Sequence, residues 1–415
     1  MLHSGNVTWP YEDGGPRRLQ SVPGALGISS RSRLEVTTRI APAATMVVGG
    51  AAHFAQAGPL YLLRHSAGEE AVSFVEQIDA MSLEPVHRSP DLNGGPVWPG
   101  GAGVAPDGFV HVVFGNHAHR LEPEGLEVVA SRRLPRERPY NSFVPLPDGH
   151  LVTKDFGGSR PAVHVAPDER EPAELLVLDP TTLDIAASLV LPEPSIARLS
   201  ADGDRIYIVG DTSVLRVVWN GKTLNLDQSF RACYRTLEGQ TYGWDCVIAA
   251  GAAWFLDDGE GSERYAGTLR GLGVSTAPLH LVRVDLATGD VVLTEVAEGP
   301  GGLVANPPLV DEARGLVVGY DAGNGVMAAF DIETLSERWR RRQDHAGHFL
   351  LYEGSGEVVT GDHGDVVIVD VASGEELARA DTEHGIAFVL FPAPGRERDF
   401  YVCSFAGVSR IAVSG

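Results

Sequence analysis

The sequence has almost no lysine, few cysteines and no long apolar run. Only two of its 33 basic residues are lysine, Lys154 and Lys222, and the net charge is −22 at pH 7. A chain with this balance has no basic face on which the phosphate backbone of DNA or RNA could release counterions. Nucleic-acid binding is therefore not expected.

No stretch approaches the roughly 20 apolar residues that a membrane-spanning helix needs. Residues 1–20 also lack the apolar core of a secretory signal, so we expect a soluble, cytoplasmic protein without a membrane partner. Cys233, Cys246 and Cys403 lie far apart with no CxxC pair, which argues against a disulfide framework and a thiolate metal site. We expect them to act as small buried hydrophobic residues.

Several motifs of nucleotide and acyl chemistry are also missing. The sequence contains no GxSxG nucleophile elbow, no GxxxxGK[ST] phosphate loop and no dinucleotide fingerprint after a strand. Neither NAD nor a nucleotide is therefore an expected cofactor.

The sequence instead contains a repeated pattern. Each repeat has three short apolar runs separated by Gly or Asp turns, and the third run ends in an apolar-x-Asp motif that is followed by a further strand. The motif recurs as EQIDAMSLEPV (76–86), LVLDPTTLDIA (176–186), VRVDLATGDVV (282–292), AAFDIETLSER (328–338) and VIVDVASGEEL (367–377). Recurrence at about 40–60 residues with alternating apolar positions is typical of four-stranded propeller blades. The fold class is therefore all-β.

We expect eight four-stranded blades, or seven if the region of blade 1 is an irregular insertion. Residues 386–413 hold only three strands, one short of a blade. Residues 33–42 resemble an outer strand and lead into blade 1, so we predict that they complete the last blade and close the ring. The expected division is an N-terminal arm or frayed tail, 1–32, and a propeller, 33–415.

The repeats VRVDLATGDVV, AAFDIETLSER and VIVDVASGEEL resemble those of quinoprotein-like (PQQ-like) and YVTN-type β-propellers. The likeness covers most of the chain and concerns the scaffold. Quinoprotein dehydrogenases carry a tryptophan in nearly every blade, with calcium beside the quinone, whereas this chain has six irregularly spaced tryptophans. PQQ is therefore not an expected cofactor.

Long connections predict which face of the ring is functional. The links between the second and third strands of blades 1, 3 and 5 are long, near 64–70, 156–173 and 258–278, and such links emerge around one mouth of the channel. The residues that begin the innermost strands should line this mouth: Tyr140, Asn141, Ser195, Arg198, Trp244, Asp245, Asn306, His345, His348 and His384. A polar, partly aromatic ring of this kind suits a small molecule.

Acidic residues end the second strand of five successive blades, at Asp155, Asp211, Asp257, Asp321 and Asp362. Aspartate at such a position commonly forms a turn by accepting backbone hydrogen bonds. Asp155 differs because it follows Lys154 and precedes Phe156 and two glycines, so a charge-paired role beside the mouth is the alternative reading.

Histidines offer a second chemistry. His345, His348 and His384 begin neighbouring inner strands, and converging imidazoles would suit one divalent transition metal. An oxygen-rich set, Asn141, Asn306 and Asp245, would suit calcium or magnesium instead.

Two functions follow from these residues. The first is a metal-assisted hydrolase or lyase that acts on a small organic substrate at the channel mouth. Its catalytic candidates are Tyr140, Lys154, Asp155, Arg198 and Asp245, with Asn141, Trp244 and Asn306 binding substrate and His345, His348 and His384 binding metal. The alternative is a non-catalytic ligand- or protein-binding propeller whose acidic face recruits a cationic partner.

Overall fold

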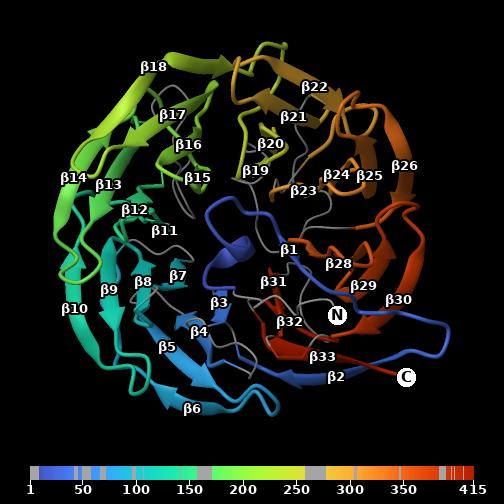
Figure 1. Cartoon of the computed structure of the whole chain (residues 1–415), viewed down its shortest axis with the longest axis horizontal. Coiled ribbons are helices and arrows are strands. Elements are labelled where there is room, and N and C mark those ends of the chain that lie inside the picture. The colour runs from blue at the N-terminus through green and yellow to red at the C-terminus, as the bar shows by residue number, and fades with distance from the viewer. Residues whose placement is uncertain are drawn as a thin grey trace.

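Alternating apolar positions separated by tight turns fold the chain into a ring of radial sheets (Figure 1). The computed structural model describes residues 9–41, 45–48 (backbone only), 58–65, 72–95, 100–105, 107–140, 142–156, 171–257, 277–302, 306–344, 347–382, 389–393, 395–396, 398–404 and 406–415. Within these residues the strands form eight sheets. The predicted eight-bladed, all-β propeller is confirmed, and the seven-bladed alternative is not.

The first four blades run from the innermost to the outermost strand. Blade 1 contains β3 (Thr45–Val48), β4 (Leu60–His65), β5 (Ser73–Ile78) and β6 (Pro85–Arg88); blade 2 contains β7 (Gly101–Val104), β8 (Val110–Phe114), β9 (His117–Leu121) and β10 (Val128–Arg133). Blade 3 contains β11 (Val144–Pro145), β12 (Leu151–Lys154), β13 (Glu174–Leu178) and β14 (Ile185–Val190); blade 4 contains β15 (Ser200–Asp202), β16 (Arg205–Val209), β17 (Ser213–Trp219) and β18 (Leu224–Cys233).

The other four blades follow the same order. Blade 5 contains β19 (Val247–Ala249), β20 (Ala252–Leu256), β21 (His280–Asp285) and β22 (Val291–Glu295); blade 6 contains β23 (Leu309–Asp311), β24 (Leu316–Asp321), β25 (Val326–Asp331) and β26 (Glu337–Arg342). Blade 7 contains β27 (Leu350–Tyr352), β28 (Glu357–Asp362), β29 (Asp365–Asp370) and β30 (Glu376–Asp381); blade 8 contains β31 (Val389–Pro392), β32 (Asp399–Cys403), β33 (Val408–Ser414) and β2 (Arg33–Arg39).

The N-terminal strand β2 closes the ring as predicted. It pairs antiparallel with β33 over its whole length, from Arg33 opposite Ser414 to Arg39 opposite Val408. The pairing gives the three C-terminal strands their fourth and removes an exposed sheet edge. Upstream of β2, the short 3₁₀ helix η1 (Glu12–Gly14) and strand β1 (Ser21–Val22) lie at the centre of the ring (Figure 1).

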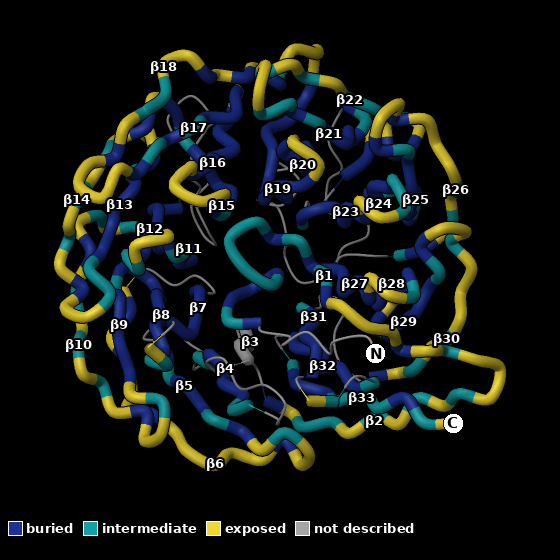
Figure 2. The backbone as a smooth tube through the Cα atoms, in the orientation of Figure 1, coloured by how far each residue is buried: buried dark blue, intermediate teal, exposed yellow. Residues whose placement is uncertain are grey.

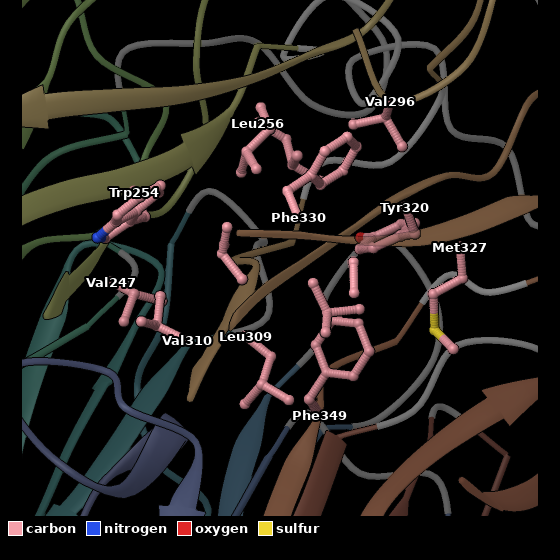
Figure 3. Close-up of a cluster of buried hydrophobic side chains, with 14 of the residues drawn as sticks. Val247, Trp254, Leu256, Val296, Leu309, Val310, Tyr320, Met327, Phe330 and Phe349 are labelled. Atoms are coloured by element: carbon pink, nitrogen blue, oxygen red, sulfur yellow. The ribbon is translucent and has the colours of Figure 1, made fainter. Parts of the chain in front are cut away.

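Apolar side chains between neighbouring blades form the core. The inner strands are largely buried, whereas outer strands such as β14 and β30 alternate toward solvent (Figure 2). Figure 3 shows one cluster, which contains Trp254 and Leu256 of blade 5 together with Tyr320 and Phe330 of blade 6. Each such fully buried side chain contributes about 1.5–3 kcal/mol. In the part of the chain that the structure describes, no helix combines the length and apolar character needed to span a membrane.

The repeated apolar-x-Asp motif has a physical explanation in the turn between the third and fourth strands. In the turns that begin at Asp79, Asp179, Asp285 and Asp331, the carboxylate accepts the backbone N–H groups two and three residues on and the hydroxyl of the Ser or Thr three residues on. Asp370 accepts the N–H and hydroxyl of Ser373 in the same way.

The residue four positions after each aspartate has a positive φ and donates its N–H to the aspartate carbonyl. This position is occupied by Leu83, Leu183, Gly289, Leu335 and Gly374. The side chains of the three leucines are buried, which offsets the strain of a left-handed backbone in a residue other than glycine. The turn is thus specified both by the acid and by the residue that follows it.

Turn hydrogen bonds lower the pKa of the carboxyl groups of Asp79, Asp179, Asp285 and Asp331 below the usual value, chiefly through backbone N–H donors. A lowered pKa in the folded state stabilises the fold above the unfolded-state pKa of about 4 and loses this effect as the pH falls through the folded-state pKa. Asp285→Asn should therefore lower the melting temperature at pH 7, with a difference from the parent protein that shrinks toward pH 3. Thermal unfolding from pH 3 to pH 7 measures it, with the exposed hairpin variant Asp202→Asn as control; a difference independent of pH would contradict the explanation.

Two glycines at the equivalent turn position allow a matched test of packing between blades. Gly289 and Gly374 both have a positive φ, but a Cβ on Gly374 would lie 2.6 Å from the Trp339 ring, whereas one on Gly289 would have its nearest neighbour at 4.0 Å. Gly289→Ala should cost about 1–2 kcal/mol from backbone strain. Gly374→Ala should cost about 1–3 kcal/mol more, because the ring of Trp339 must move. Denaturant unfolding measures both free energies of unfolding. Equal decreases would show that the Trp339 side chain can move aside without an energetic cost.

Candidate functional site

The centre of the ring is occupied by residues 9–22 of the chain itself, which we call the plug (Figures 1 and 2). Backbone N–H groups of four innermost strands donate to plug carbonyls: Val104 to Pro10 (2.9 Å), Ala201 to Pro16 (2.8 Å), Ile248 to Arg17 (2.9 Å) and Leu351 to Gln20 (2.8 Å). Blades 2, 4, 5 and 7 therefore all hold it. A frayed tail was one expectation for this segment; from Trp9 onward the chain is instead packed in the channel, because the inner strands offer unused backbone donors.

The tip of the plug places two adjacent carboxyl groups near the axis. Asp13 has a left-handed backbone conformation, with φ 59°, which aspartate tolerates better than most residues. Its carboxylate accepts hydrogen bonds from His348 Nδ1 at 2.6 Å and from Arg18 Nη1 at 2.6 Å. All three side chains are buried, so this is a desolvated, charge-assisted contact between the plug and the entrance of blade 7.

The neighbouring Glu12 connects the plug to blades 4 and 5. Its Oε2 lies 3.1 Å from Nε of Arg198, which precedes β15. Arg198 in turn donates its backbone N–H to Asp245 Oδ1 at 2.5 Å and lies with Nη1 3.2 Å from Asp245 Oδ2. Asp245 is fully buried, so Arg198 bridges a carboxylate of the plug and a carboxylate of the ring.

The pKa values within this cluster move in opposite directions. Burial raises the pKa of Glu12, although Arg198 lies close by. Burial also acts to raise that of Asp13, but His348 and Arg18 hold the pKa of this carboxyl well below its usual range. For His348, burial lowers the pKa, but the carboxylates of Asp13 and Glu12 raise it above its ordinary value overall. The charges balance when His348 is protonated, with three carboxylates (Glu12, Asp13, Asp245) against three cations (Arg18, Arg198, His348).

Adjacent carboxyl groups whose pKa values diverge are an arrangement that acid–base sites use. Here each group also ties the plug to the ring. Arg198, Asp245 and His348, which the sequence placed at the mouth, therefore belong to one charge cluster, in which Arg198 and His348 contact carboxylates of the plug. The sequence analysis missed these plug residues. The signal that could have found them is the run WPYEDGGPRR (9–18), in which two aromatic residues and balanced charges stand within a segment read as an arm.

Lys154 and Asp155 lie together at the end of β12 on blade 3. The ammonium group of Lys154 is fully buried and donates to the carbonyl oxygens of Ser195, at 2.8 Å, and Asp155, at 2.9 Å. Burial lowers the pKa of Lys154 to about 8, against the opposing influence of Asp155 and Asp245. The contacts join the end of β12 to the entrance of blade 4.

The Asp155 carboxylate is fully buried and has several partners. Its Oδ2 lies 3.1 Å from both Arg136 and Arg138, and its Oδ1 accepts the backbone N–H of Glu174 at 2.5 Å. Tyr140 forms an isolated antiparallel bridge with Asp155, and burial raises the pKa of the Tyr140 hydroxyl above its usual range. Asp155 thus fastens the two ends of the long connection between β12 and β13.

The other strand-end acids have similar contacts. Asp257 accepts the backbone N–H of His280 at 2.7 Å, Asp321 accepts those of Gly302 and Asn324, and Asp362 accepts that of Asp344. Of these bonds, the one from Asn324 to Asp321 is local, as the turn-forming interpretation expects; the others come from residues 18 to 23 positions away and join separate segments. Asp211 also ends its strand at this face and is buried.

The remaining candidates are dispersed. Trp244 is buried and packs edge-to-face on Phe156, with ring centroids 6.1 Å apart. The backbone N–H of Asn306 donates to the Tyr320 hydroxyl at 2.8 Å. Asn141, His345 and His384 lie outside the described residues. Among the residues that are described, no group of three or more His, Cys, Asp or Glu side chains is arranged to hold a metal ion.

A small pocket remains between the plug and blades 2 and 3. Tyr11, Glu12 and Arg18 line it from the plug, and Ser142 and Phe143 from blade 3. The hydroxyl of Ser142 is buried and has no hydrogen-bond partner among the described residues. The free space is about that of one water molecule.

Neither a protein-family model nor a curated protein sequence matches this chain. Solved structures do. BamB from Moraxella catarrhalis matches with a TM-score of 0.58 at 14% identity, over 89% of this chain and 99% of its own. The quinohemoprotein alcohol dehydrogenase ADHIIG from Pseudomonas putida HK5 matches with a TM-score of 0.63 at 13% identity, over 98% of this chain and 80% of its own. A europium-containing methanol dehydrogenase matches with a TM-score of 0.62 at 9% identity, over 100% of this chain and 99% of its own.

At these identities the likeness is one of fold. Two of these names imply a metal or redox cofactor. Among the predicted metal ligands, His348 is engaged with Asp13, and His345 and His384 lie outside the described residues. The predicted resemblance is confirmed at the level of the scaffold: the chain has an eight-bladed β-propeller fold similar to that of these solved structures.

Removing the charge of Asp13 should loosen the plug. Asp13→Asn leaves His348 and Arg18 buried without their carboxylate, which costs about 3 kcal/mol. The amides of Val104 and Leu351, which donate to plug carbonyls, should then exchange with deuterium about a hundredfold faster. Hydrogen exchange with mass spectrometry measures this, with Asp290→Asn on an outer turn as control. Unchanged protection would show that the backbone contacts alone hold the plug.

Proposed function

We propose that this chain is a non-catalytic binding propeller, a rigid ring that recruits a partner instead of converting a substrate. The observation that carries the proposal is the closed charge network at the axis. Arg198, Asp245 and His348 are bound to each other or to the plug. A catalytic site needs groups that are free to meet a substrate, whereas these groups act as ties.

The proposal includes a cytoplasmic location. Its support is that Cys233, Cys246 and Cys403 are all free thiols, as expected for a reducing compartment. Burial raises the pKa of Cys246 to about 11 and that of Cys403 to about 12, which keeps both thiols protonated and unreactive.

The second candidate is a hydrolase or lyase for a small organic substrate, and Lys154 is the residue that favours it. A fully buried lysine whose pKa falls to about 8 is poised to stabilise negative charge or to exchange a proton near neutral pH. Residues 157–170 and 258–276, which fall within the long connections that the sequence analysis assigned to the mouth, lie outside the described residues.

Stability measurements distinguish the two functions without a known substrate. If the axial groups are ties, Arg198→Met and Asp245→Asn should each destabilise the fold by about 3–5 kcal/mol, because each leaves a buried charge unpaired. Lys154→Met should also destabilise it, because two carbonyls lose their donor. If the groups are catalytic and held at a cost to stability, their replacement should leave the melting temperature unchanged or raise it.

Arg216→Met is the matched control. Arg216 also bridges to an aspartate within blade 4, Asp227 at 2.7 Å, and its side chain is 14% exposed compared with 12% for Arg198. The proposal expects Arg198→Met to cost at least as much as Arg216→Met in denaturant unfolding. A stabilised Arg198→Met protein beside a destabilised Arg216→Met protein would favour the enzyme.

A further inference from the structure

We infer that the axial channel is a peptide-binding site, and that the plug is its ligand in cis. The ligand class is an extended peptide that carries a pair of acids with aromatic residues beside them. The inference rests on the proposed binding function and names what is bound. Four features of the plug and the ring carry it.

The first feature is recognition of backbone. Strand β1 of the plug adds to the inner edge of blade 7 by parallel pairing, with Ser21 opposite Leu351 and Val22 opposite Tyr352. The described pairings within the blades are all antiparallel. Addition of a strand to an open sheet edge is a general mode of peptide recognition, in which main-chain hydrogen bonds supply affinity and side-chain pockets supply specificity.

The second feature is recognition of an aromatic side chain. Tyr11 bridges to Gly103 of β7, and a Cβ on Gly103 would lie 2.3 Å from the Tyr11 ring. The glycine therefore forms a flat seat for this ring. Trp9, two residues earlier, is 1% exposed and packs in the apolar cluster of blades 1, 7 and 8. Alternate residues of the plug are thus anchored in separate places, as expected for an extended ligand.

The third feature is charge. The net charge of the whole chain is −22, yet the ring presents Arg198 and His348 to the tip of the plug, where they meet Glu12 and Asp13. Cations in this position favour carboxylate groups at the matching positions of a ligand. Gln20 adds a polar readout, because its amide nitrogen donates to the Pro308 carbonyl at 3.0 Å and its amide oxygen accepts the Phe349 N–H at 2.9 Å.

The fourth feature is that the plug and the closure of the ring are separate elements. Strand β2 begins at Arg33 and pairs with β33, whereas the plug contacts inner strands and ends at Val22. Residues 23–32 connect them. Within this segment Leu26, Gly27 and Ile28 donate their N–H groups to Glu357 of blade 7, whereas the turn at 29–31 is exposed. A cut in this turn therefore separates the plug and residues 23–28 from β2. The pocket at Ser142, beside Tyr11 and Glu12, offers a ligand a contact that the plug leaves unused.

Exchange of the plug tests the inference on the full chain. A site-specific protease sequence inserted after Ser30 allows the folded protein to be cut, which leaves β2 on blade 8 and the plug held without a covalent link. A fluorescent peptide of residues 8–28 is then added, and its binding and the release of the native fragment are followed by fluorescence anisotropy and mass spectrometry. The inference expects saturable replacement of the native fragment by the peptide while the ring remains folded.

Two matched variants report whether the described contacts carry the binding. A peptide with Glu12→Gln and Asp13→Asn should bind at least tenfold more weakly to the cut protein. The parent peptide should likewise bind at least tenfold more weakly to cut protein carrying Gly103→Ala, because the added methyl group occupies the seat of Tyr11. A scrambled peptide of the same composition should not replace the fragment.

Three outcomes would overturn the inference: a folded, cut protein that never exchanges its fragment, one that accepts the scrambled peptide equally well, and a ring that unfolds on cutting. The last would make the plug part of the fold instead of a ligand. None of these results bears on the binding function itself, which the Arg198, Asp245 and Lys154 variants test in the uncut protein.

Discussion

Everything in this molecule depends on the pairing of β2 with β33. Blade 8 has only three strands from the C-terminal part of the chain, and a sheet edge left open there would expose unpaired backbone groups and break the ring. The antiparallel register from Arg33–Ser414 to Arg39–Val408 supplies the missing strand. Because the ring is closed, the innermost strands of opposite blades stay at fixed positions, and groups as distant in sequence as Asp13 and His348 can meet at the axis.

The axial contacts show how the N-terminal segment of the chain pairs with buried polar groups of the ring. Side chains such as Lys154 and Arg198 are expensive to bury unless each donor finds an acceptor. The plug supplies Glu12 and Asp13 for the cations of the ring, and its carbonyls accept the N–H groups of the inner strands. Because the same contacts hold residues 9–22 in the channel, the channel resembles a binding site that is occupied by part of its own chain.

The architecture could be predicted from the sequence because short local motifs specify it and recur from blade to blade. An aspartate such as Asp285, with Thr288 three residues on and Gly289 at the left-handed position, specifies one turn wherever it occurs. The closing strand was predictable because three strands at the C-terminus need a fourth. The mouth positions of Arg198, Asp245 and His348 followed from the blade register. Their partners in the plug could not be assigned, because the plug meets the blades through a few residues each and has no repeat. The run at 9–18 suggests a packed segment, but it does not say which blade each residue meets.

The strand that completes the last blade is separated from its partner by nearly the whole polypeptide: Thr38 and Ser409, which share a hydrogen bond, are 371 residues apart. Closing a loop of that length costs about 5 kcal/mol of chain entropy, so this contact forms only after most of the intervening sheets exist. On the ribosome, β2 is synthesised long before β33 and must wait for it. Until then the nascent chain carries two open sheet edges, and chaperones or a rapid final step must keep neighbouring copies from joining at them.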